Sequence, residues 1–219
     1  MVNIELYICQ LMNKLKDNFG NRLLYVGLQG SYLRGEATPD SDLDIMVILE
    51  SLDVSDLERY RGIVSSMDHA DKSCGFICAR EDLANWNPLE IWSLVNGTKD
   101  YFGKLEDFIP AYSRLDILNY SKMSLNNLYH ELCHRYIHGN PNRTAQVLPG
   151  LYKSTFYILQ CLHYLDHGYY IGTKKELLSV LEGKARSVLK ISMHWDESDP
   201  AVDRFELLFS WCQEALRNV

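Results

Sequence analysis

Two aspartates separated by a single residue are the strongest candidates for chemistry in this sequence. Asp42 and Asp44 flank Leu43 and lead into an apolar run that ends at Leu49. Residues two apart in a strand point to the same face, so the two carboxylates are expected side by side. Adjacent carboxylates repel one another unless a cation lies between them, and Mg²⁺ prefers such oxygen ligands. We therefore predict that Asp42 and Asp44 bind Mg²⁺ and are catalytic.

A glycine-serine pair lies ten residues before the aspartates and suits a phosphate group. Gly30 allows the backbone to turn tightly and to approach a ligand closely. Ser31 follows at an expected helix N-terminus, where N–H groups favour anions, and Arg34 adds a guanidinium one turn later. Phosphate-binding groups and metal-binding carboxylates would thus meet at one edge of a small sheet. This combination is typical of phosphoryl or nucleotidyl transfer.

The elements that hold these residues follow from apolar runs and turn signals in the first half of the chain. Short apolar runs bounded by turn residues predict buried strands, and apolar residues three or four apart predict helices. Strands are expected over residues 23–28, 45–49 and 73–79, and helices over residues 3–19, 54–67 and 88–96. A turn is expected at Tyr101, Phe102 and Gly103. These elements predict a small mixed sheet with helices beside it.

The second half of the chain has a helical pattern throughout. Helices are expected over residues 113–139, 148–167 and 200–217, and a capping box from Thr173 to Glu176 opens another. Together they would form a bundle of about four or five helices. The predicted fold class is therefore α+β, with a small mixed-sheet head over residues 1–109 followed by an all-α helical bundle over residues 110–219.

Composition limits the class of partner. The chain has 219 residues, of which 47% are hydrophobic, and a formal net charge of −7. Nucleic acid is not expected as a partner, because general nucleic-acid binders usually carry a basic stripe. The six cysteines include no CxxC pair, and the N-terminus lacks the features of a signal peptide. No apolar run approaches the roughly 18 residues of a membrane span. A cytoplasmic protein without membrane contact is predicted.

The segment from Gly30 to Val47, GSYLRGEATPDSDLDIMV, resembles the signature of the DNA polymerase beta-like nucleotidyltransferase superfamily. It is similar to the small bacterial members, including antibiotic nucleotidyltransferases that act on aminoglycosides and lincosamides. The resemblance implies that residues 1–109 form a nucleotidyltransferase domain, in which Asp42 and Asp44 ligate Mg²⁺. The nucleotide-binding residues that it implies are Gly30, Ser31, Arg34, Ser41 and, by region rather than by motif, Lys153 of the helical half.

The sequence departs from this superfamily at one position. Members usually supply a third carboxylate from a strand beside the first two, and this group often acts as the base for the incoming hydroxyl. The predicted strand over residues 73–79 contains no acid. Asp71, Glu81 and Glu131 are the candidates for the base. If none of them serves, the alternative is a non-catalytic protein that binds a nucleotide or a partner.

Residues 130–134 read HELCH and offer a second, different chemistry. HExxH on a helix places both imidazoles on one face and is the signature of zinc peptidases. His138 has the wrong spacing for the third ligand, so a zinc hydrolase using His130, Glu131 and His134 is the less favoured alternative. Otherwise Glu131 or His134 orients the acceptor or acts as base in a cleft between the domains, or the residues form an ordinary helix face.

These observations together predict a nucleotidyltransferase. The enzyme would transfer a nucleoside monophosphate, in the first place AMP from ATP, to a hydroxyl group of a small-molecule acceptor. Mg²⁺ would be the cofactor, and pyrophosphate would be released. A protein acceptor stays open as an alternative. The sequence defines neither the acceptor, nor the preferred nucleoside triphosphate, nor the oligomeric state.

Overall fold

The computed structural model describes residues 1–196, 198 and 200–219, apart from the side chains of residues 141–144. The chain divides into two compact units, Met1–Tyr112 and Ser113–Val219. The predicted boundary between residues 109 and 110 lies three residues before this division. Each unit has hydrophobic clusters of its own.

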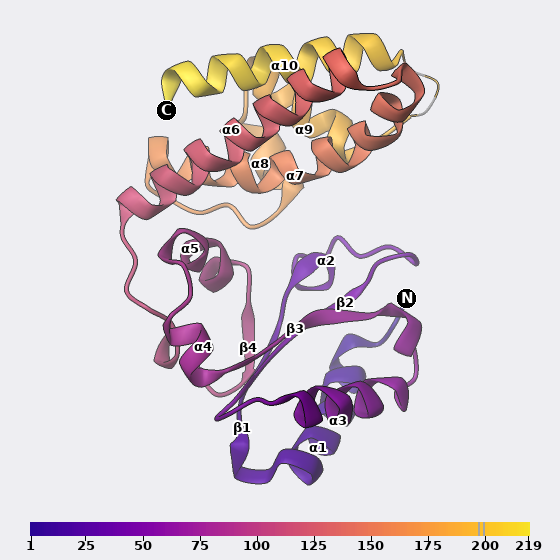
Figure 1. Cartoon of the computed structure of the whole chain (residues 1–219), viewed down its shortest axis with the longest axis vertical. Helices are drawn as coiled ribbons and strands as arrows, with labels where there is room; N and C mark the ends of the chain where they lie inside the picture. The colour runs from indigo at the N-terminus through magenta and orange to yellow at the C-terminus, as the bar shows by residue number, and fades with distance from the viewer. Residues whose placement is uncertain (197, 199) are drawn as a thin grey trace. The chain divides into compact units, whose positions relative to one another are not determined.

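A four-stranded sheet forms the centre of the first unit (Figure 1). The strands lie in the order β3-β2-β1-β4, with β1 at Leu23–Leu28, β2 at Leu43–Leu49, β3 at Ser73–Ala79 and β4 at Lys99–Phe102. Strand β2 runs parallel to β3, while β1 is antiparallel to both β2 and β4. The predicted α+β class, with a small mixed sheet before an all-α bundle, is confirmed.

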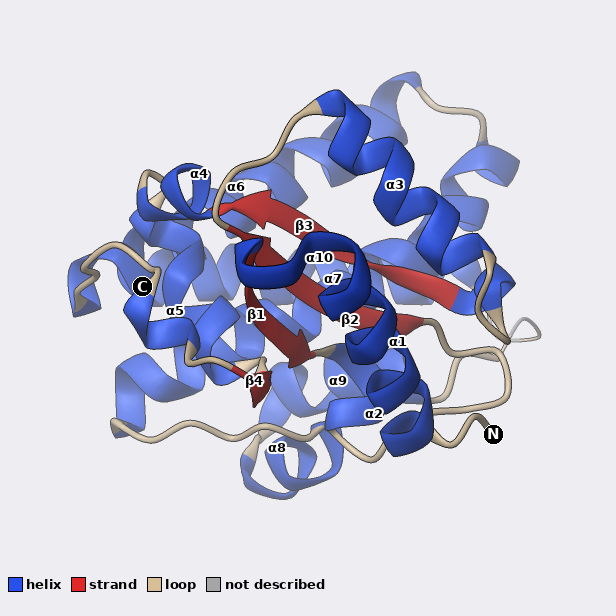
Figure 2. Cartoon of the chain, turned by 90° about the horizontal axis from the view of Figure 1, so that it is seen from below, coloured by secondary structure: helices blue, strands red, loops and turns tan. Residues whose placement is uncertain are grey.

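One face of the sheet is covered by α1 (Ile4–Phe19) and α3 (Val54–Ser65), as Figure 2 shows. Alternate side chains of β2 point toward this face and are buried there: Leu43, Ile45, Val47 and Leu49. Burial of an aliphatic side chain stabilises a fold by about 1.5–3 kcal/mol. A slip of β2 by one residue would move all four to the opposite face of the sheet, so this cluster helps to fix the register of the strand that carries Asp44.

The opposite face of the sheet is apolar at one end only. Its apolar cluster contains Met46, Ile48, Cys78 and Leu83, and the adjacent helices are α4 (Arg80–Ala84) and α5 (Pro88–Asn96). Asp44 precedes Met46 by two residues in β2 and therefore lies on this same face. The face thus changes from apolar to polar toward the beginning of β2.

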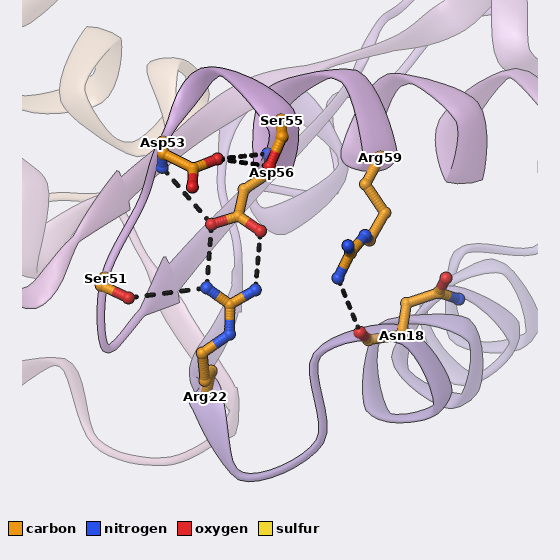
Figure 3. Close-up of polar contacts among 7 residues, drawn as sticks. All are labelled: Asn18, Arg22, Ser51, Asp53, Ser55, Asp56 and Arg59. Atoms are coloured by element: carbon orange, nitrogen blue, oxygen red, sulfur yellow. Dashed lines mark hydrogen bonds and ion pairs between the residues drawn. The ribbon is translucent and has the colours of Figure 1, made fainter.

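The end of the sheet remote from Asp44 is held by an ion pair between Arg22 and Asp56 (Figure 3). Arg22 Nη2 lies 2.6 Å from Asp56 Oδ1, and Nη1 lies 2.9 Å from Oδ2. Asp56 also accepts the N–H of Asp53, whose own carboxylate accepts the N–H of Asp56, which closes a capping box at the start of α3. These donors, the Arg22 hydrogen bonds above all, hold the pKa of the Asp56 carboxyl below its ordinary value.

The predicted turn at Tyr101-Phe102-Gly103 is wrong for its first two residues, because Tyr101 and Phe102 belong to β4. This strand pairs with β1 and forms one edge of the sheet. Gly103 turns the chain, with a φ of +73°. Strand β4 spans four residues, of which Lys99 and Asp100 are charged, so the apolar run that reveals a buried strand in a sequence does not form.

The second unit is a bundle of helices (Figure 1). They are α6 (Arg114–His138), α7 (Pro141–His167), α8 (Lys174–Val180), α9 (Gly183–Met193) and α10 (Ala201–Asn218). Leucines from all five of these helices, including Leu177 of α8, make up its core together with buried aromatic side chains of α7 and α10. Thr173 caps α8 as the sequence predicts, since the Glu176 N–H donates to Thr173 Oγ1 at 3.2 Å.

The bundle differs from the prediction in two helices. Helix α7 begins at Pro141, seven residues before the predicted start at Leu148, and continues through Pro149. A proline normally interrupts a helix because it lacks an N–H donor, which is why the sequence favours a later start. Helix α9 is not predicted at all. Over the described residues, none of the helices is both long enough and apolar enough to span a bilayer.

Candidate active site

The carboxylate of Asp44 is seated against the backbone of Gly30. Strand β1 leads into Gln29, whose N–H donates to the Asp44 carbonyl at 2.9 Å, and the chain then turns into α2 (Gly30–Leu33). Gly30 has a φ of +71°, and a Cβ added there would lie 1.9 Å from Asp44 Oδ2. Any side chain at this residue would therefore meet both backbone strain and the carboxylate. The structure brings together the glycine bend and the second aspartate of the motif.

Asp42 lies one residue outside strand β2, which begins at Leu43. Leu43 pairs with Ser73 at the first position of the parallel ladder between β2 and β3, so the ladder does not hold Asp42. The side chain of Asp42 is exposed, whereas that of Asp44 is partly buried. The expectation that both aspartates belong to the strand is right for Asp44 only, and the preceding loop places Asp42.

A turn over residues 38–41 leads into the two aspartates. The Thr38 N–H donates to Ser41 Oγ at 2.8 Å, and the Ser41 N–H donates to the Thr38 carbonyl at 3.1 Å. Lys72, just before β3, donates to the carbonyl of Pro39 in the same turn. Ser41 and Lys72 thus fix the course of the loop that carries Asp42.

Ser31 and Arg34 lie at α2, a helix of only four residues. So short a helix has little dipole, and any attraction for a phosphate must come from the backbone N–H groups and the Ser31 hydroxyl. Arg34 forms an ion pair with Glu36, with Nε 2.9 Å from Oε2 and side chains that are 16% and 22% exposed. Glu36 therefore orients the guanidinium and offsets part of its charge.

Strand β3, which borders Asp44, contains no acid. Cys74 occupies the position that pairs with Asp44 in the parallel ladder, and it is exposed. Of the candidates for a base, Asp71 lies in a 3-10 turn just before β3, at the same end of the sheet as Asp44. Glu81 lies in α4 beyond the other end of β3, roughly 20 Å away at the usual rise per residue of a strand. The topology favours Asp71 over Glu81.

The remaining predicted residues lie in the second unit. Glu131 pairs with Arg135 on α6, with Oε1 2.7 Å from Nε. His130 and His134 are exposed on the same helix, with ring centroids 6.1 Å apart, and Lys153 is exposed on α7. In the part of the chain that the structure describes, no group of three or more His, Cys, Asp or Glu residues is arranged to hold a metal ion. The HELCH pattern therefore gains no third ligand there.

Gln29 and Thr98 are two polar residues at this end of the sheet that no sequence motif indicates. Gln29 Nε2 donates to Thr98 Oγ1 at 2.8 Å and also lies 3.8 Å from the sulfur of Met46. Thr98 Oγ1 in turn donates to the Leu94 carbonyl at 2.6 Å. The one signal in the sequence is that a polar residue separates the apolar run of β1 from Gly30.

Asp100 and Tyr25 form a structural pair on the same face. The Tyr25 hydroxyl donates to Asp100 Oδ1 at 2.6 Å, and the Leu105 N–H donates to the same oxygen at 3.4 Å. Burial, and then the neighbouring Asp100 carboxylate, raises the pKa of Tyr25 far above its ordinary value. The phenol therefore keeps its proton near neutral pH, and the pair joins β1 to β4 rather than serving as a base.

The donors at the glycine bend fit Mg²⁺. This cation takes oxygen ligands and is usually bound by one or two carboxylates together with substrate phosphates and water. Asp44 presents a carboxylate beside a bend that has no side chain of its own, and Asp42 offers a second, exposed carboxylate two residues earlier. Two protein carboxylates suffice for such a site when a triphosphate supplies further oxygens.

Residues 8–75 match the family described as nucleotidyltransferase domain. The matched span includes most of α1, the Gly30 bend, both aspartates and the beginning of β3. The sequence has no significant match among curated proteins.

The fold is similar to that of spectinomycin adenyltransferase AAD(9) from Enterococcus faecialis, whose crystal structure contains ATP and spectinomycin. The alignment covers 98% of this chain and 100% of that chain, with a TM-score of 0.62 and 14% identity, which indicates a shared fold. A toxin-antitoxin structure with AMP-PNP aligns with 62% of this chain and 94% of that chain at 22% identity, with a TM-score of only 0.35. The match of residues 8–75 to a nucleotidyltransferase domain agrees with the superfamily and the enzyme class that the motif from Gly30 to Val47 predicts.

Proposed function

We propose that this protein transfers AMP from ATP to a hydroxyl group of a small-molecule acceptor, with Mg²⁺ as cofactor and with release of pyrophosphate. The observation that carries the proposal is the carboxylate of Asp44 seated against Gly30, within a segment that matches a nucleotidyltransferase domain. Such a bend supports a site in which a triphosphate and a divalent cation meet.

The polar groups around the bend have separate proposed roles. The backbone N–H groups that follow Gly30, the Ser31 hydroxyl and Arg34 hold the β- and γ-phosphates. Asp42 and Asp44 hold Mg²⁺, which when bound offsets the negative charge of the triphosphate and of the transition state. These contacts fix the α-phosphorus for attack, and positioning of this kind supplies most of the catalysis in phosphoryl transfer.

The chemical step is a displacement at the α-phosphorus. The acceptor oxygen forms a bond to this phosphorus, and the bond from phosphorus to the α–β bridging oxygen breaks. Pyrophosphate leaves with the electron pair of the broken bond. The hydroxyl proton passes to solvent, directly or through Asp71, the candidate base that the sheet topology favours.

The fold similarity suggests which substrates to test first. The structure of AAD(9) was solved with ATP and spectinomycin, so ATP and a hydroxyl-bearing antibiotic are the first choices. Ser41 and Lys153 are proposed as further nucleotide contacts. In this proposal residues 1–109 bind the nucleotide, while the role of residues 110–219 as a helical-bundle domain and the cytoplasmic location remain predictions of the sequence.

One observation favours a second candidate function. The superfamily usually supplies its third carboxylate from a strand beside the first two, but β3 contains no acid and has Cys74 opposite Asp44. This supports a protein that binds a nucleotide without transferring it. A zinc hydrolase has no comparable support, because Glu131 is engaged in an ion pair with Arg135. A small-molecule acceptor remains favoured over a protein acceptor only by the fold similarity.

The test is transfer of label from α-labelled ATP to a panel of aminoglycoside, aminocyclitol and lincosamide antibiotics, with and without Mg²⁺. The wild type should give a labelled product and an equal amount of pyrophosphate, and Asp44→Asn should give neither. Asp40→Asn is the matched control, since it makes the same charge change at an exposed residue of the same loop and should keep full activity. If the wild type releases no pyrophosphate while ATP and Mg²⁺ still raise its Tm, the non-catalytic alternative replaces this proposal.

A further inference from the structure

Three polar side chains form a row across the sheet at the proposed metal ligand, in the order Thr98, Gln29 and Asp44. Gln29 and Asp44 are cross-strand neighbours, because the Gln29 N–H donates to the Asp44 carbonyl at 2.9 Å. Thr98 lies on the other side of Gln29, just before β4, and accepts the hydrogen bond from its amide. Opposed residues in a sheet have Cβ atoms about 4.5–5.5 Å apart. The side chain of Gln29 therefore stands beside that of Asp44.

The hydrogen bonds of Gln29 identify the nitrogen and the oxygen of its side-chain amide. Thr98 has a single hydroxyl proton, and this proton goes to the Leu94 carbonyl at 2.6 Å. The amide atom 2.8 Å from Thr98 Oγ1 must therefore be a donor, which identifies it as Nε2. The same nitrogen also points to the Met46 sulfur, at 3.8 Å. Both donor positions are thus directed into the protein, and Oε1 is the group left for a ligand.

The environment of Gln29 suits a hydrogen-bond acceptor that faces a substrate. Gln29 is partly exposed, and it lies on the polar end of the sheet face, between Asp44 and Thr98. Strand β3 on the far side of Asp44 offers Cys74 at the paired position instead of a carboxylate. In the row formed by Thr98, Gln29 and Asp44, Gln29 is directly opposite Asp44, and its Oε1 is a neutral oxygen.

We propose that Oε1 of Gln29 accepts a hydrogen bond from the attacking hydroxyl and holds this hydroxyl in line with the α-phosphorus. This inference rests on the proposed nucleotidyl transfer. An amide carbonyl does not take up the proton, so the hydroxyl proton still passes to water as the new oxygen–phosphorus bond forms. A phosphoryl-transfer transition state with loose bonding needs orientation more than it needs deprotonation, and a glutamine orients the attacking water in small GTPases in this way.

The test separates turnover from nucleotide binding in the full chain. Gln29→Met keeps the length of the side chain but removes the oxygen, and the loss of orientation should lower kcat for transfer about 10- to 100-fold. The KM for ATP, and the Tm increase caused by ATP and Mg²⁺, should stay within about twofold of the wild type. The acceptor is the best one from the antibiotic panel, and water is the second nucleophile, measured as pyrophosphate release without acceptor.

Substitutions at Thr98 provide a matched pair of variants in which Gln29 itself is unchanged. Thr98→Val removes the oxygen that anchors the amide and should lower kcat, while Thr98→Ser keeps this oxygen and should restore most of the loss. In the double variant, Thr98→Val should add little to Gln29→Met, because both changes remove the same orientation.

The outcomes are distinct. A wild type without turnover toward any acceptor overturns the proposed function and this inference with it. An active wild type together with a Gln29→Met variant whose kcat stays within twofold overturns this inference alone. A raised KM for ATP at unchanged kcat also overturns it, since Gln29 would then contact the nucleotide. If Gln29→Met fails to fold, equal kcat values for Thr98→Val and Thr98→Ser overturn it.

Discussion

Two pairs of aspartates lie at opposite ends of strand β2, and their surroundings differ. Asp53 and Asp56 follow the end of the strand, and both oxygens of Asp56, which is 2% exposed, accept hydrogen bonds from Arg22. Asp44, near the beginning of the strand, instead has its carboxylate against the bare backbone of Gly30. The comparison teaches that residue type alone does not separate a structural acid from a candidate ligand. Arg22 binds both oxygens of the Asp56 carboxylate, whereas the missing side chain of Gly30 leaves space for the carboxylate of Asp44.

Replacing Asp44 should have the largest effect on activity. Asp44→Asn removes the charge of the proposed metal ligand and should lower kcat/KM for transfer by about 10³-fold, the scale seen when preorganised electrostatic stabilisation is lost. Its Tm should change less than that of Asp56→Asn. Label transfer from ATP and a melting curve by circular dichroism measure the two quantities, and activity within tenfold of the wild type would show that the two aspartate pairs do not differ as described.

Gly30→Ala tests the same contact between Gly30 and the Asp44 carboxylate from the side of the glycine. A Cβ at residue 30 would lie 1.9 Å from Asp44 Oδ2, whereas one at Gly35 would meet nothing within 4 Å, although φ is +71° and +67° at the two residues. Each alanine should cost about 1–2 kcal/mol of folding free energy because of the left-handed backbone. Only Gly30→Ala should also lower transfer by about 10²-fold, since it displaces a catalytic group. Urea unfolding and the transfer assay separate these effects, and equal activities would contradict the contact.

Asp56→Asn should lower stability but not activity, which is the reverse of the effect expected for Asp44→Asn. It removes a bidentate ion pair and part of the α3 capping box, so it should lower the Tm while the activity of the folded fraction stays at the wild-type level. The double variant with Arg22→Met should unfold only slightly more easily than Asp56→Asn, because both substitutions remove one interaction. If Asp56→Asn lost as much activity as Asp44→Asn, a purely structural role for Asp56 would be contradicted.

The smallest expected effect is a dependence of this ion pair on pH. The pKa of Asp56 is below its ordinary value in the folded chain, where Arg22 is the main cause, and near about 3.9 in the unfolded chain. The stabilisation is therefore fully present above the ordinary pKa and is lost as the pH falls through the lower, folded value. The difference in urea midpoint between the wild type and Asp56→Asn should be constant near neutral pH and shrink below about pH 4. A difference that grows as the pH falls would contradict the shift.

The sequence predicts those parts of the molecule that depend on neighbouring residues. The bend at Gly30, the strand predicted over residues 45–49 and the cap of α8 by Thr173 each depend on a few consecutive residues, and the structure contains each of them, with the strand beginning two residues earlier at Leu43. The apolar spacing that predicts α1 and α3 is similarly local.

The parts that could not be predicted depend on pairing between distant segments. Strand β4 exists because it pairs with β1, with Gly27 opposite Asp100, 73 residues later. The neighbourhood of Gln29 likewise follows from Thr98 and Asp44, which the sheet brings to either side of it. Asp42 departs from the expected strand because the ladder with β3 starts only at Leu43.

The close fit between Gly30 and Asp44 has a consequence for directed evolution. A library that randomises codon 30 would contain almost only clones with a displaced acid, because even the smallest side chain collides with it. A search for variants that accept a new antibiotic should therefore keep codon 30 fixed.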